Sequence, residues 1–334
     1  MSLNISLSRW ANQQWYQRKT PNPLLSRLET IFREGVSLRQ EAYQTGRIRS
    51  ERLPVPVIVV GNLTVGGSGK TPLTIWLAQF LKSRGYRPGI ISRGYGGTAS
   101  RKPLAVDFNT SPRLAGDEPV LMARRTGCPV YVSRQRVEAG RALLANNDCN
   151  IIIADDGLQH YALARDIEIV VVDGKRGFGN GHLLPAGPLR EPIERLNSVD
   201  LVVYNGGTPD GNHAMTLQGA LAVNLRDMWK RRKLEEFAGK PLYALAGIGN
   251  PQRFFDHLAR HGLAFQQRAL PDHHEFKATD LAFASDGPLL MTEKDAVKCR
   301  EFAREDDWYL PVEAHLPATF GLELLNLIKT KTHG

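Results

Sequence analysis

The stretch that most directly suggests chemistry is residues 57–72, VIVVGNLTVGGSGKTP, where a β-branched run leads into a glycine-rich loop. The loop ends in Gly69-Lys70-Thr71, as in the phosphate-binding pattern G-x-x-x-x-G-K-[ST], although Thr64 stands where that pattern has its first glycine. In such loops backbone N–H groups surround phosphates, the lysine reaches the β- and γ-phosphates, and the last hydroxyl binds Mg²⁺. The expected nucleotide-binding residues are Thr64, Val65, Gly66, Gly67, Ser68, Gly69, Lys70 and Thr71.

The surroundings of this loop favour a phosphate site over a chance match. A strand is expected over 56–60 and a helix over 71–83, so backbone N–H groups and a helix N-terminus would converge on one anion. Gly66, Gly67 and Gly69 would let the backbone adopt unusual angles and approach the phosphates closely. The alternative is an ordinary glycine-rich turn that carries a surface lysine.

A second acidic element fits the same chemistry. In NIIIADDG, a buried strand is expected to end at Asp155 and Asp156. Nucleotide-binding enzymes with such loops hold Mg²⁺ through an Asp at the end of a second buried strand. Both carboxylates are therefore candidate metal ligands, and the sequence does not decide between them. The alternative is that they cap a helix.

Two short segments could activate a hydroxyl group that accepts a phosphate. AGDEP places Asp117 near the start of a helical stretch, and PDHHEF gathers Asp272, His273 and His274. An Asp beside a His can orient the imidazole or share its proton, which is what a general base requires. The alternative for both segments is helix capping. A metal site is disfavoured, because adjacent histidines do not share one helix face.

Two further segments have unusual composition. GNGHLLPAGPLRE, residues 179–191, is rich in glycine and proline and ends in Arg190 and Glu191, which suits contact with a substrate or phosphate. MTEKDAVK, residues 291–298, is similar to the guanine-reading pattern [NT]-K-x-D, but Lys294 and Asp295 are adjacent. The failed spacing argues against a GTPase.

The elements that must position these residues alternate between strands and helices from residue 55 onward. Strands are expected at 56–60, 88–92, 129–132, 150–154, 167–172, 200–204, 220–223, 242–246, 288–291 and 308–312. Helices are expected at 22–45, 71–83, 113–126, 134–146, 251–261, 277–285 and 319–329. Such alternation predicts parallel strands with right-handed crossovers, and the continuous apolar runs predict strands buried on both faces. The charged stretch 224–240 interrupts the alternation and suggests a domain boundary.

Composition narrows the class of protein. The 334 residues are 42% apolar and 23% charged, as in soluble globular proteins, and no apolar run is long enough to span a bilayer. We find no secretory signal. The three cysteines are far apart, so neither a disulfide framework nor a zinc site is expected, and a reducing compartment is the default.

The N-terminal segment has a character of its own. Residues 1–52 hold nine of the Lys and Arg residues but four of the Asp and Glu residues, so much of the net charge of +9 lies here. Asn22 and Pro23 can begin a helix, and apolar residues follow at helical spacing. These residues are Leu24, Leu25, Leu28, Ile31 and Phe32. A basic amphipathic helix suits an anionic membrane interface, and the alternative is packing on the chain's own core.

Taken in order, these motifs resemble a known family. GNLTVGGSGKTP, SRGYGG, GDEP, SRQR, DDGLQH, GPLRE, PDHH and TEKDAVK occur in this order between residues 57 and 298. The set is similar to that of the tetraacyldisaccharide 4'-kinases, the lipid A 4'-kinases of Gram-negative bacteria, in which a small hydroxyl residue usually replaces the first glycine of the loop. The resemblance implies transfer of the ATP γ-phosphate to the 4'-hydroxyl of a tetraacyl glucosamine disaccharide 1-phosphate.

The resemblance also implies roles for residues. Asp117 and His273 would act together as the base, Lys70 and Thr71 would serve the phosphates and Mg²⁺, and Asp155 or Asp156 would bind the metal. Residues that would contact the substrate, by likeness alone, are Arg93, Tyr95, Arg136, Gln159, His160, Arg190, Glu191 and His274.

The implied architecture is a P-loop NTPase-like α/β/α domain with a mostly parallel sheet, a smaller C-terminal α/β domain and an N-terminal amphipathic helix. We expect a membrane-associating segment over 1–50, the kinase domain over 51–228 and the smaller domain over 229–334. The implied partners are ATP, Mg²⁺, the lipid substrate and an anionic membrane, with peripheral attachment to the cytoplasmic face of the inner membrane. The default oligomeric state is a monomer.

Two rival functions remain. A nucleotide-driven switch of the metallochaperone or partner-loading type uses similar loops, but such proteins usually have a Cys/His cluster or a guanine motif, which this sequence lacks. A nucleic-acid-binding ATPase is suggested only by the basic charge, which is concentrated at one terminus beside an apolar stripe rather than along a groove. We therefore expect no nucleic-acid partner.

Overall fold

The structure is a computed structural model, and it describes residues 10–18, 20–98, 102–207 and 213–332. Residues 1–9, part of the expected membrane-associating segment, lie outside this description. Within the described ranges, no helix is both long and apolar enough to cross a membrane. A short helix over residues 10–16 comes first, and helix α2 (Pro23–Gln44) follows it.

The phosphate loop belongs to a nine-stranded sheet with the order β15-β8-β7-β6-β1-β5-β2-β4-β3. Its strands are β1 (Val57–Gly61), β2 (Pro88–Ser92), β3 (Leu104–Val106), β4 (Val130–Val132), β5 (Ile151–Asp155), β6 (Ile167–Asp173), β7 (Leu201–Asn205), β8 (His213–Gln218) and β15 (Glu313–His315). All neighbouring strands in it are parallel except β3 with β4 and β15 with β8. Because β1 lies between β5 and β6, the loop after β1 emerges beside the carboxyl ends of both.

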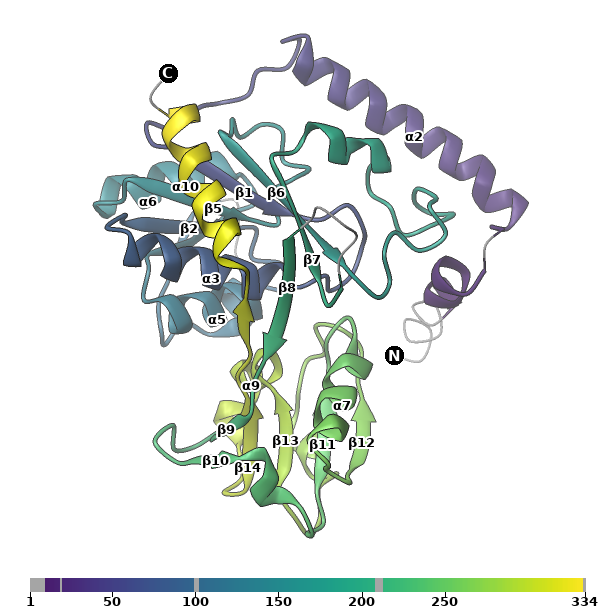
Figure 1. Ribbon diagram of the computed structural model, residues 1–334, viewed down its shortest axis with the longest axis vertical. Helices are drawn as coiled ribbons and strands as arrows, with labels where there is room; N and C mark the ends of the chain where they lie inside the picture. The colour runs from purple at the N-terminus through teal and green to yellow at the C-terminus, as the bar shows by residue number, and fades with distance from the viewer. Residues whose placement is uncertain (1–9, 19, 99–101, 208–212, 333–334) are drawn as a thin grey trace.

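Helices cover both faces of this sheet (Figure 1). One core cluster joins the sheet to α3 (Lys70–Ser83), α5 (Asp117–Thr126) and α10 (Ala318–Thr332), while a second joins the other face to α6 (Arg136–Asn146). Short helical segments α4 (Pro112–Ala115) and η1 (Ile193–Ser198) complete this part. The three-layer α/β/α fold with a mostly parallel sheet is therefore confirmed.

A second, six-stranded sheet has the order β10-β9-β14-β13-β11-β12 and lies below the larger one in Figure 1. Its strands are β9 (Leu221–Asn224), β10 (Arg231–Lys233), β11 (Tyr243–Ala246), β12 (Gln266–Ala269), β13 (Leu289–Thr292) and β14 (Asp307–Leu310). Its helical segments are η2 (Leu234–Phe237), α7 (Pro251–Arg260), α8 (Ala278–Leu281), α9 (Glu293–Cys299) and η3 (Arg300–Phe302). The chain enters this sheet after β8 and returns to the larger one at β15. The domain limits at 50/51 and 228/229 stay predictions.

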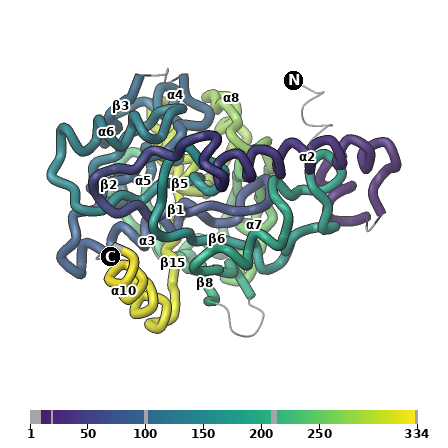
Figure 2. Tube along the Cα trace, turned by 90° about the horizontal axis from the view of Figure 1, so that it is seen from above, coloured from purple at the N-terminus to yellow at the C-terminus, as the bar shows by residue number. Residues whose placement is uncertain are grey.

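Helix α2 begins as its sequence predicts, since the side chain of Asn22 accepts a hydrogen bond from the Leu24 N–H at 2.9 Å and Pro23 is the first helical residue. Its apolar residues do not form the single stripe expected. Phe32 packs against the second core cluster of the larger sheet, the one that includes α6, whereas Leu28 and Ile31 are exposed. Successive residues are 100° apart around a helix, so Leu25 and Phe32 lie on a different side from Leu24, Leu28 and Ile31. In both views α2 lies along the outside of the larger sheet (Figures 1 and 2).

The expected strands of both sheets are present, with ends shifted by a residue or two. The helix expected over 113–126 is interrupted at Gly116, whose φ of 91° lies outside the helical region. The helix expected over 277–285 is reduced to the single turn of α8. The strands absent from the expectation are β3, β8, β10, β12 and β15, and the helical segments absent from it are α9, η1, η2, η3 and the helix over residues 10–16.

Candidate active site

A buried side-chain amide holds the glycine-rich loop between β1 and α3. Asn205, the last residue of β7, donates a hydrogen bond from Nδ2 to the carbonyl oxygen of Ser68 at 2.9 Å. Gly69 has a φ of +103°, and a Cβ on it would lie 2.2 Å from Asn205 Nδ2. The contact therefore requires glycine at this position both for backbone conformation and for space. Sequence reasoning missed Asn205, because a single polar residue at a strand end carries no spacing signal.

Lys70, the first residue of α3, points toward the carboxyl end of β5. Its Nζ lies 3.4 Å from Oδ1 of Asp156, and Nη1 of Arg190 lies 3.2 Å from the same oxygen. Burial alone would raise the pKa of Asp156, but the charges of Lys70 and Arg190 lower it to about 2. Residues 70, 156 and 190, which are far apart in the sequence, thus form one charged cluster.

Asp155 has different surroundings from its neighbour. Its carboxylate is buried and accepts hydrogen bonds from the hydroxyls of Thr74 at 3.2 Å and Ser92 at 3.4 Å. Burial, followed by the nearby charges of Glu118 and Asp156, raises the pKa of Asp155 to about 7. The α3 hydroxyl against this carboxylate is that of Thr74, about one turn after the Thr71 expected from the motif.

The donors at this point fit Mg²⁺. Carboxylate and hydroxyl oxygens are the ligands it prefers, and crowding of acidic groups around Asp155 would be relieved by a divalent cation. Among the residues that the structure describes, no group of three or more His, Cys, Asp or Glu side chains could hold a metal by itself. This agrees with the usual Mg²⁺ arrangement, in which one or two carboxylates act together with substrate phosphates and water.

Asp117 and His273 lie side by side, although they come from different sheets. Asp117 begins α5 beside the larger sheet, His273 follows β12 of the smaller one, and His273 Nδ1 lies 3.3 Å from Asp117 Oδ2. Burial disfavours the charged form of both side chains. Interaction with His273 and the charges of Lys294 and Lys298 nevertheless hold the pKa of Asp117 well below its usual range. The same interaction with Asp117 raises the pKa of His273.

The backbone at two of these residues is unusual. In the described part of the chain, the non-glycine residues with positive φ are Asp156, at 46°, and His273, at 57°. Such conformations cost free energy and persist where the surrounding structure enforces them, often at functional sites. The ring of Tyr95 lies against His273 with centroids 4.8 Å apart. The surrounding structure therefore holds both Asp156 and His273, the former through Lys70 and Arg190 and the latter through Tyr95.

Cationic side chains lie near Asp156, beyond the carboxyl ends of β2, β4 and β5. Arg136 donates from Nη2 to the carbonyl oxygen of Asp156 at 3.0 Å, and its buried Nε has no hydrogen-bond partner among the described residues. Burial lowers the pKa of Arg136 to about 10 and that of His160 to about 4, the latter with help from Arg136 and Arg93 among nearby cations. Buried guanidinium N–H groups without a hydrogen-bond partner are uncommon in folded proteins.

A hydrogen-bonded chain connects this region to α2. Glu191 is buried and accepts from Gln159 Nε2 at 3.2 Å and from Gln40 Nε2 of α2 at 3.1 Å. Gln159 Oε1 in turn accepts from Arg190 at 3.4 Å. The expected substrate residues Gln159, Arg190 and Glu191 are therefore in contact with one another. His274 lies elsewhere, since its Nε2 is 3.0 Å from Asp280 Oδ2 of α8.

Helix α9 contributes a lysine that the expected site did not include. Lys294 Nζ lies 2.9 Å from Glu118 Oε1 and 3.3 Å from Asp272 Oδ1, so it bridges α5 and the loop that carries His273. These carboxylates raise the pKa of Lys294 against the opposing effect of burial. The TEKDAVK segment has a signal for a charged helix, since Thr292 can cap it and charged residues follow.

Comparison with known proteins decides the family. Residues 21–329 match the model of the family described as tetraacyldisaccharide-1-P 4'-kinase. The chain belongs to the tetraacyldisaccharide-1-P 4'-kinase family. Relatives named tetraacyldisaccharide 4'-kinase include one from Nitrosococcus oceani, 54% identical over 315 residues, which cover 94% of this chain and 93% of that protein. Another from Pseudomonas aeruginosa is 50% identical over 314 residues, covering 93% and 94% of the respective chains.

A solved structure supports the same membership in the tetraacyldisaccharide-1-P 4'-kinase family. LpxK from Aquifex aeolicus, crystallised in complex with ATP, matches with a TM-score of 0.74 and 27% sequence identity. The match covers 90% of this chain and 98% of that chain. The resemblance inferred from the motifs is therefore confirmed, and the switch-type NTPase is not favoured.

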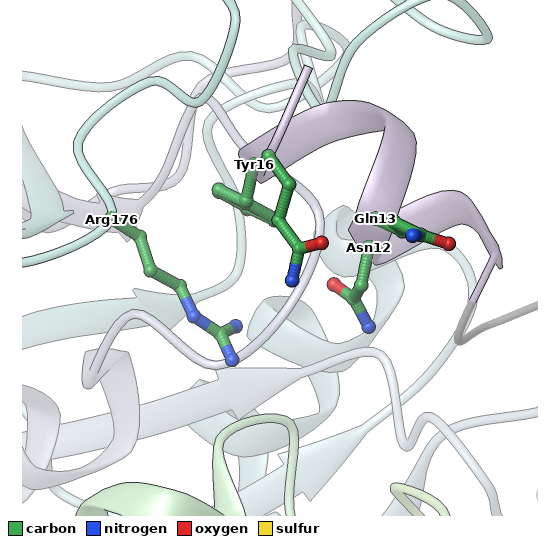
Figure 3. Close-up of a pocket in the computed structure, with 5 residues that line it drawn as sticks. Asn12, Gln13, Tyr16 and Arg176 are labelled. Atoms are coloured by element: carbon green, nitrogen blue, oxygen red, sulfur yellow. The ribbon is translucent and has the colours of Figure 1, made fainter.

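One cavity of this tetraacyldisaccharide-1-P 4'-kinase family member was not expected. A polar pocket of about 470 Å³ lies between the helix over residues 10–16 and the loop after β6 (Figure 3). Its lining residues are Asn12, Gln13, Tyr16, Gln17 and Arg176. The guanidinium of Arg176 lies over the Tyr16 ring, and its Nη1 donates to the carbonyl oxygen of Gly249 at 3.2 Å. The pocket contains none of the residues expected to be in the site.

Proposed function

We propose that this chain transfers the γ-phosphate of ATP to the 4'-hydroxyl of a tetraacyl glucosamine disaccharide 1-phosphate, giving the bisphosphorylated lipid A precursor. The observation that carries the proposal is the Asp117–His273 pair in a chain of this family. Asp272, next to His273, and Gly67 of the phosphate loop both lie close to Gly249, which brings the pair near that loop. The ATP complex of the Aquifex aeolicus relative supports ATP as the donor.

The loop would hold the triphosphate through its backbone N–H groups, with Lys70 directed at the β- and γ-phosphates. In its present position Lys70 is paired with Asp156 at 3.4 Å, so binding of the nucleotide would exchange a carboxylate for phosphate oxygens. Mg²⁺, when bound, would neutralise charge on the transferring phosphoryl group. Asp155 and Asp156 would hold that ion, together with the Thr71 hydroxyl expected from the motif.

His273 would take the proton of the 4'-hydroxyl as the acceptor oxygen bonds to the γ-phosphorus and the bond from phosphorus to the β,γ-bridging oxygen breaks. The low pKa of Asp117 keeps it a carboxylate, which favours a proton on the facing Nδ1 of His273. The free electron pair of the imidazole is then on Nε2, and that atom is the base. Asp117 orients the ring and stabilises the cation that forms.

The acceptor lipid carries a phosphate, and the cationic region next to the loop suits it. Arg136 has a buried Nε without a partner, and Arg93 and His160 lie near it. Guanidinium groups bind phosphate through paired N–H donors, which a single lysine cannot do. Tyr95 packs on His273, and Arg190 contacts Asp156 and Gln159. These side chains would orient the sugar, with the buried Glu191 holding Gln159.

The exposed stripe of α2 supports peripheral attachment to an anionic membrane. Leu24, Leu28, Ile31 and Leu38 are all exposed on one side of this helix, while Glu29 on another side is buried. Burying a Leu or Ile side chain contributes about 1.5–3 kcal/mol, and a basic residue near an anionic leaflet contributes about 1 kcal/mol. A few such groups give reversible attachment. We place the enzyme at the cytoplasmic face of the inner membrane, where ATP is present.

The proposal is tested by incubating the purified chain with labelled ATP, Mg²⁺ and a disaccharide lipid that carries one phosphate. Mass spectrometry should find a lipid product with a second phosphate, and fragmentation should locate that phosphate at the 4' position. ATP or GTP hydrolysis without a phosphorylated lipid would instead favour a nucleotide-driven switch.

A further inference from the structure

Three buried polar atoms meet at the carboxylate of Asp117 without completing a hydrogen bond. They are Asp117 Oδ2, His273 Nδ1 and Lys298 Nζ, and none has a hydrogen-bond partner among the described residues. Oδ2 lies 3.3 Å from the imidazole nitrogen and 3.5 Å from the lysine nitrogen. Oδ1 of Asp295, 3.3 Å from the lysine nitrogen, is also buried without a hydrogen-bond partner in the described part of the chain. Buried polar atoms are rarely left unpaired, so the lysine is the shared partner of the two carboxylates and the imidazole faces Asp117.

Lys298 is held in this position and is not a mobile surface lysine. It lies on α9, where its Nζ is 3.3 Å from Oδ1 of the fully buried Asp295 and 4.8 Å from the centre of the Phe276 ring. Asp295 itself accepts hydrogen bonds from the Thr292 hydroxyl and from the backbone N–H of Gly247 at 2.9 Å. Contacts within the smaller unit, to Asp295 and Phe276, therefore hold the ammonium group in the position from which it reaches Asp117.

Helix α9 also docks on α5, which carries Asp117. Glu293 pairs with Arg125 of α5 at 2.8 Å, and Lys294 pairs with Glu118 at 2.9 Å. His273 and Lys298 thus both come from the smaller sheet, and both approach the same carboxylate oxygen of the larger unit. Correct docking of α9 places the base and the lysine together.

The charges that face Asp117 come from three elements. From α5 comes Glu118, from the loop after β12 come Asp272 and His273, and from α9 come Lys294 and Lys298, with Asp295 behind the latter. Both lysines favour the carboxylate form of Asp117, and Lys294 also opposes a positive charge on His273. Asp117 and Asp272, by contrast, raise the pKa of His273.

We propose that Lys298 is a positioning residue for the phosphoryl transfer, which holds Asp117 ionised and aligned with His273. The inference rests on the proposed role of the Asp117–His273 pair. With Lys298 in place, the proton taken from the acceptor hydroxyl stays on His273 and does not move to Asp117. Without it, Asp117 loses a cationic neighbour and His273 becomes easier to protonate. The alternative is a purely structural role, in which Lys298 only neutralises Asp295 and supports folding.

The test compares the pH dependence of kcat for the wild-type chain, Lys298→Met and Lys298→Arg, with Lys329→Met on α10 as the matched control. Loss of the cation should lower kcat at neutral pH by about tenfold or more and move the acidic limb of the profile about one unit to higher pH, because the pKa of His273 rises. Lys298→Arg and the control should keep the wild-type limb. Thermal melting of each variant reports folding, and Lys298→Gln serves as a second neutral variant if Lys298→Met does not fold.

A Lys298→Met profile that superposes on that of the wild type overturns the inference. So does a loss that is uniform at every pH, or one that follows unfolding in both neutral variants. The proposed function fails in a different way, namely when the wild-type chain forms no phosphorylated lipid or when Asp117→Asn retains its full rate in the same assay.

Discussion

His273 Nδ1 lies 3.3 Å from Oδ2 of Asp117, although Asp117 begins a helix of the larger α/β unit and His273 follows a strand of the smaller one. The proposed base therefore exists only where the two units meet. Docking of α9 on α5 fixes that meeting, through the pairs Arg125–Glu293 and Glu118–Lys294. The geometry of the proposed base therefore depends on contacts well beyond the phosphate loop.

The raised pKa of His273 predicts the acid limb of the activity profile. Interaction with Asp117 lifts the imidazole above its ordinary value of 6.5, and only the neutral ring can accept a proton. Activity should therefore fall as pH decreases, with a midpoint above 6.5. The measurement is kcat/KM for lipid phosphorylation against pH, which reports the free enzyme. A rate that stays constant well below 6.5 would contradict this assignment.

Removing the loop lysine should lower the turnover rate strongly without unfolding the chain. Lys70→Ala deletes the cation directed at the phosphates, and loss of such a group typically costs about 10²–10³-fold in rate. Lys175→Ala, which changes an exposed lysine paired with Asp256, is the control. Initial rates at saturating ATP should separate the two variants. Equal rates for the two variants would show that Lys70 does not act on the phosphates during transfer.

The buried amide beneath the loop should matter for nucleotide binding. Asn205→Ala leaves the carbonyl oxygen of Ser68 without its partner, and an unsatisfied buried polar group costs about 1–3 kcal/mol. We expect the KM for ATP to rise about tenfold, since about 1.4 kcal/mol corresponds to that factor. Asn146→Ala, on the exposed side of α6, is the matched control. The idea fails if both variants bind ATP equally well.

Charge placed on the exposed stripe of α2 should weaken membrane attachment. Ile31→Glu and Leu38→Glu change side chains that are 67% and 64% exposed, so folding should be unaffected. Leu322→Glu, at a residue 66% exposed on α10, is a control of equal chemistry. Co-sedimentation with anionic vesicles should fall for the α2 variants alone. Activity on detergent-dispersed lipid should be retained. Unchanged sedimentation would argue against the membrane role of this helix.

Much of the site could be predicted because its parts have local signals. The strand, glycine-rich loop and helix around Lys70 follow from β-branched, glycine and helix-forming residues in succession. Asp155 and Asp156 follow a buried apolar run, and Asp117 begins a helix after a glycine. The pairing of Asp117 with His273 came from resemblance to a family, since nothing in the spacing of two distant segments places them together.

What could not be predicted depends on tertiary contacts. Asn205, Lys294 and Lys298 are single polar residues whose roles arise only when β7 passes beneath the loop and α9 docks on α5. The short strands β3 and β15 lie at the edges of the sheet, where three residues carry too little pattern to be seen. The sequence pattern does not separate the two sides of α2, because Leu25 and Phe32 lie only about 40–60° around the helix axis from Leu28.

The central claim is that Asp117 and His273 act as one unit in phosphoryl transfer, and a double-mutant cycle tests it most directly. Single-turnover transfer from bound ATP to the lipid would be measured for Asp117→Asn, His273→Ala and the double variant, with ATP binding checked in each. The account predicts that each single change lowers the rate by about 10²–10⁴-fold and that the double variant is no slower than the worse single one. Near-normal transfer by either single variant, or losses that multiply, would contradict it.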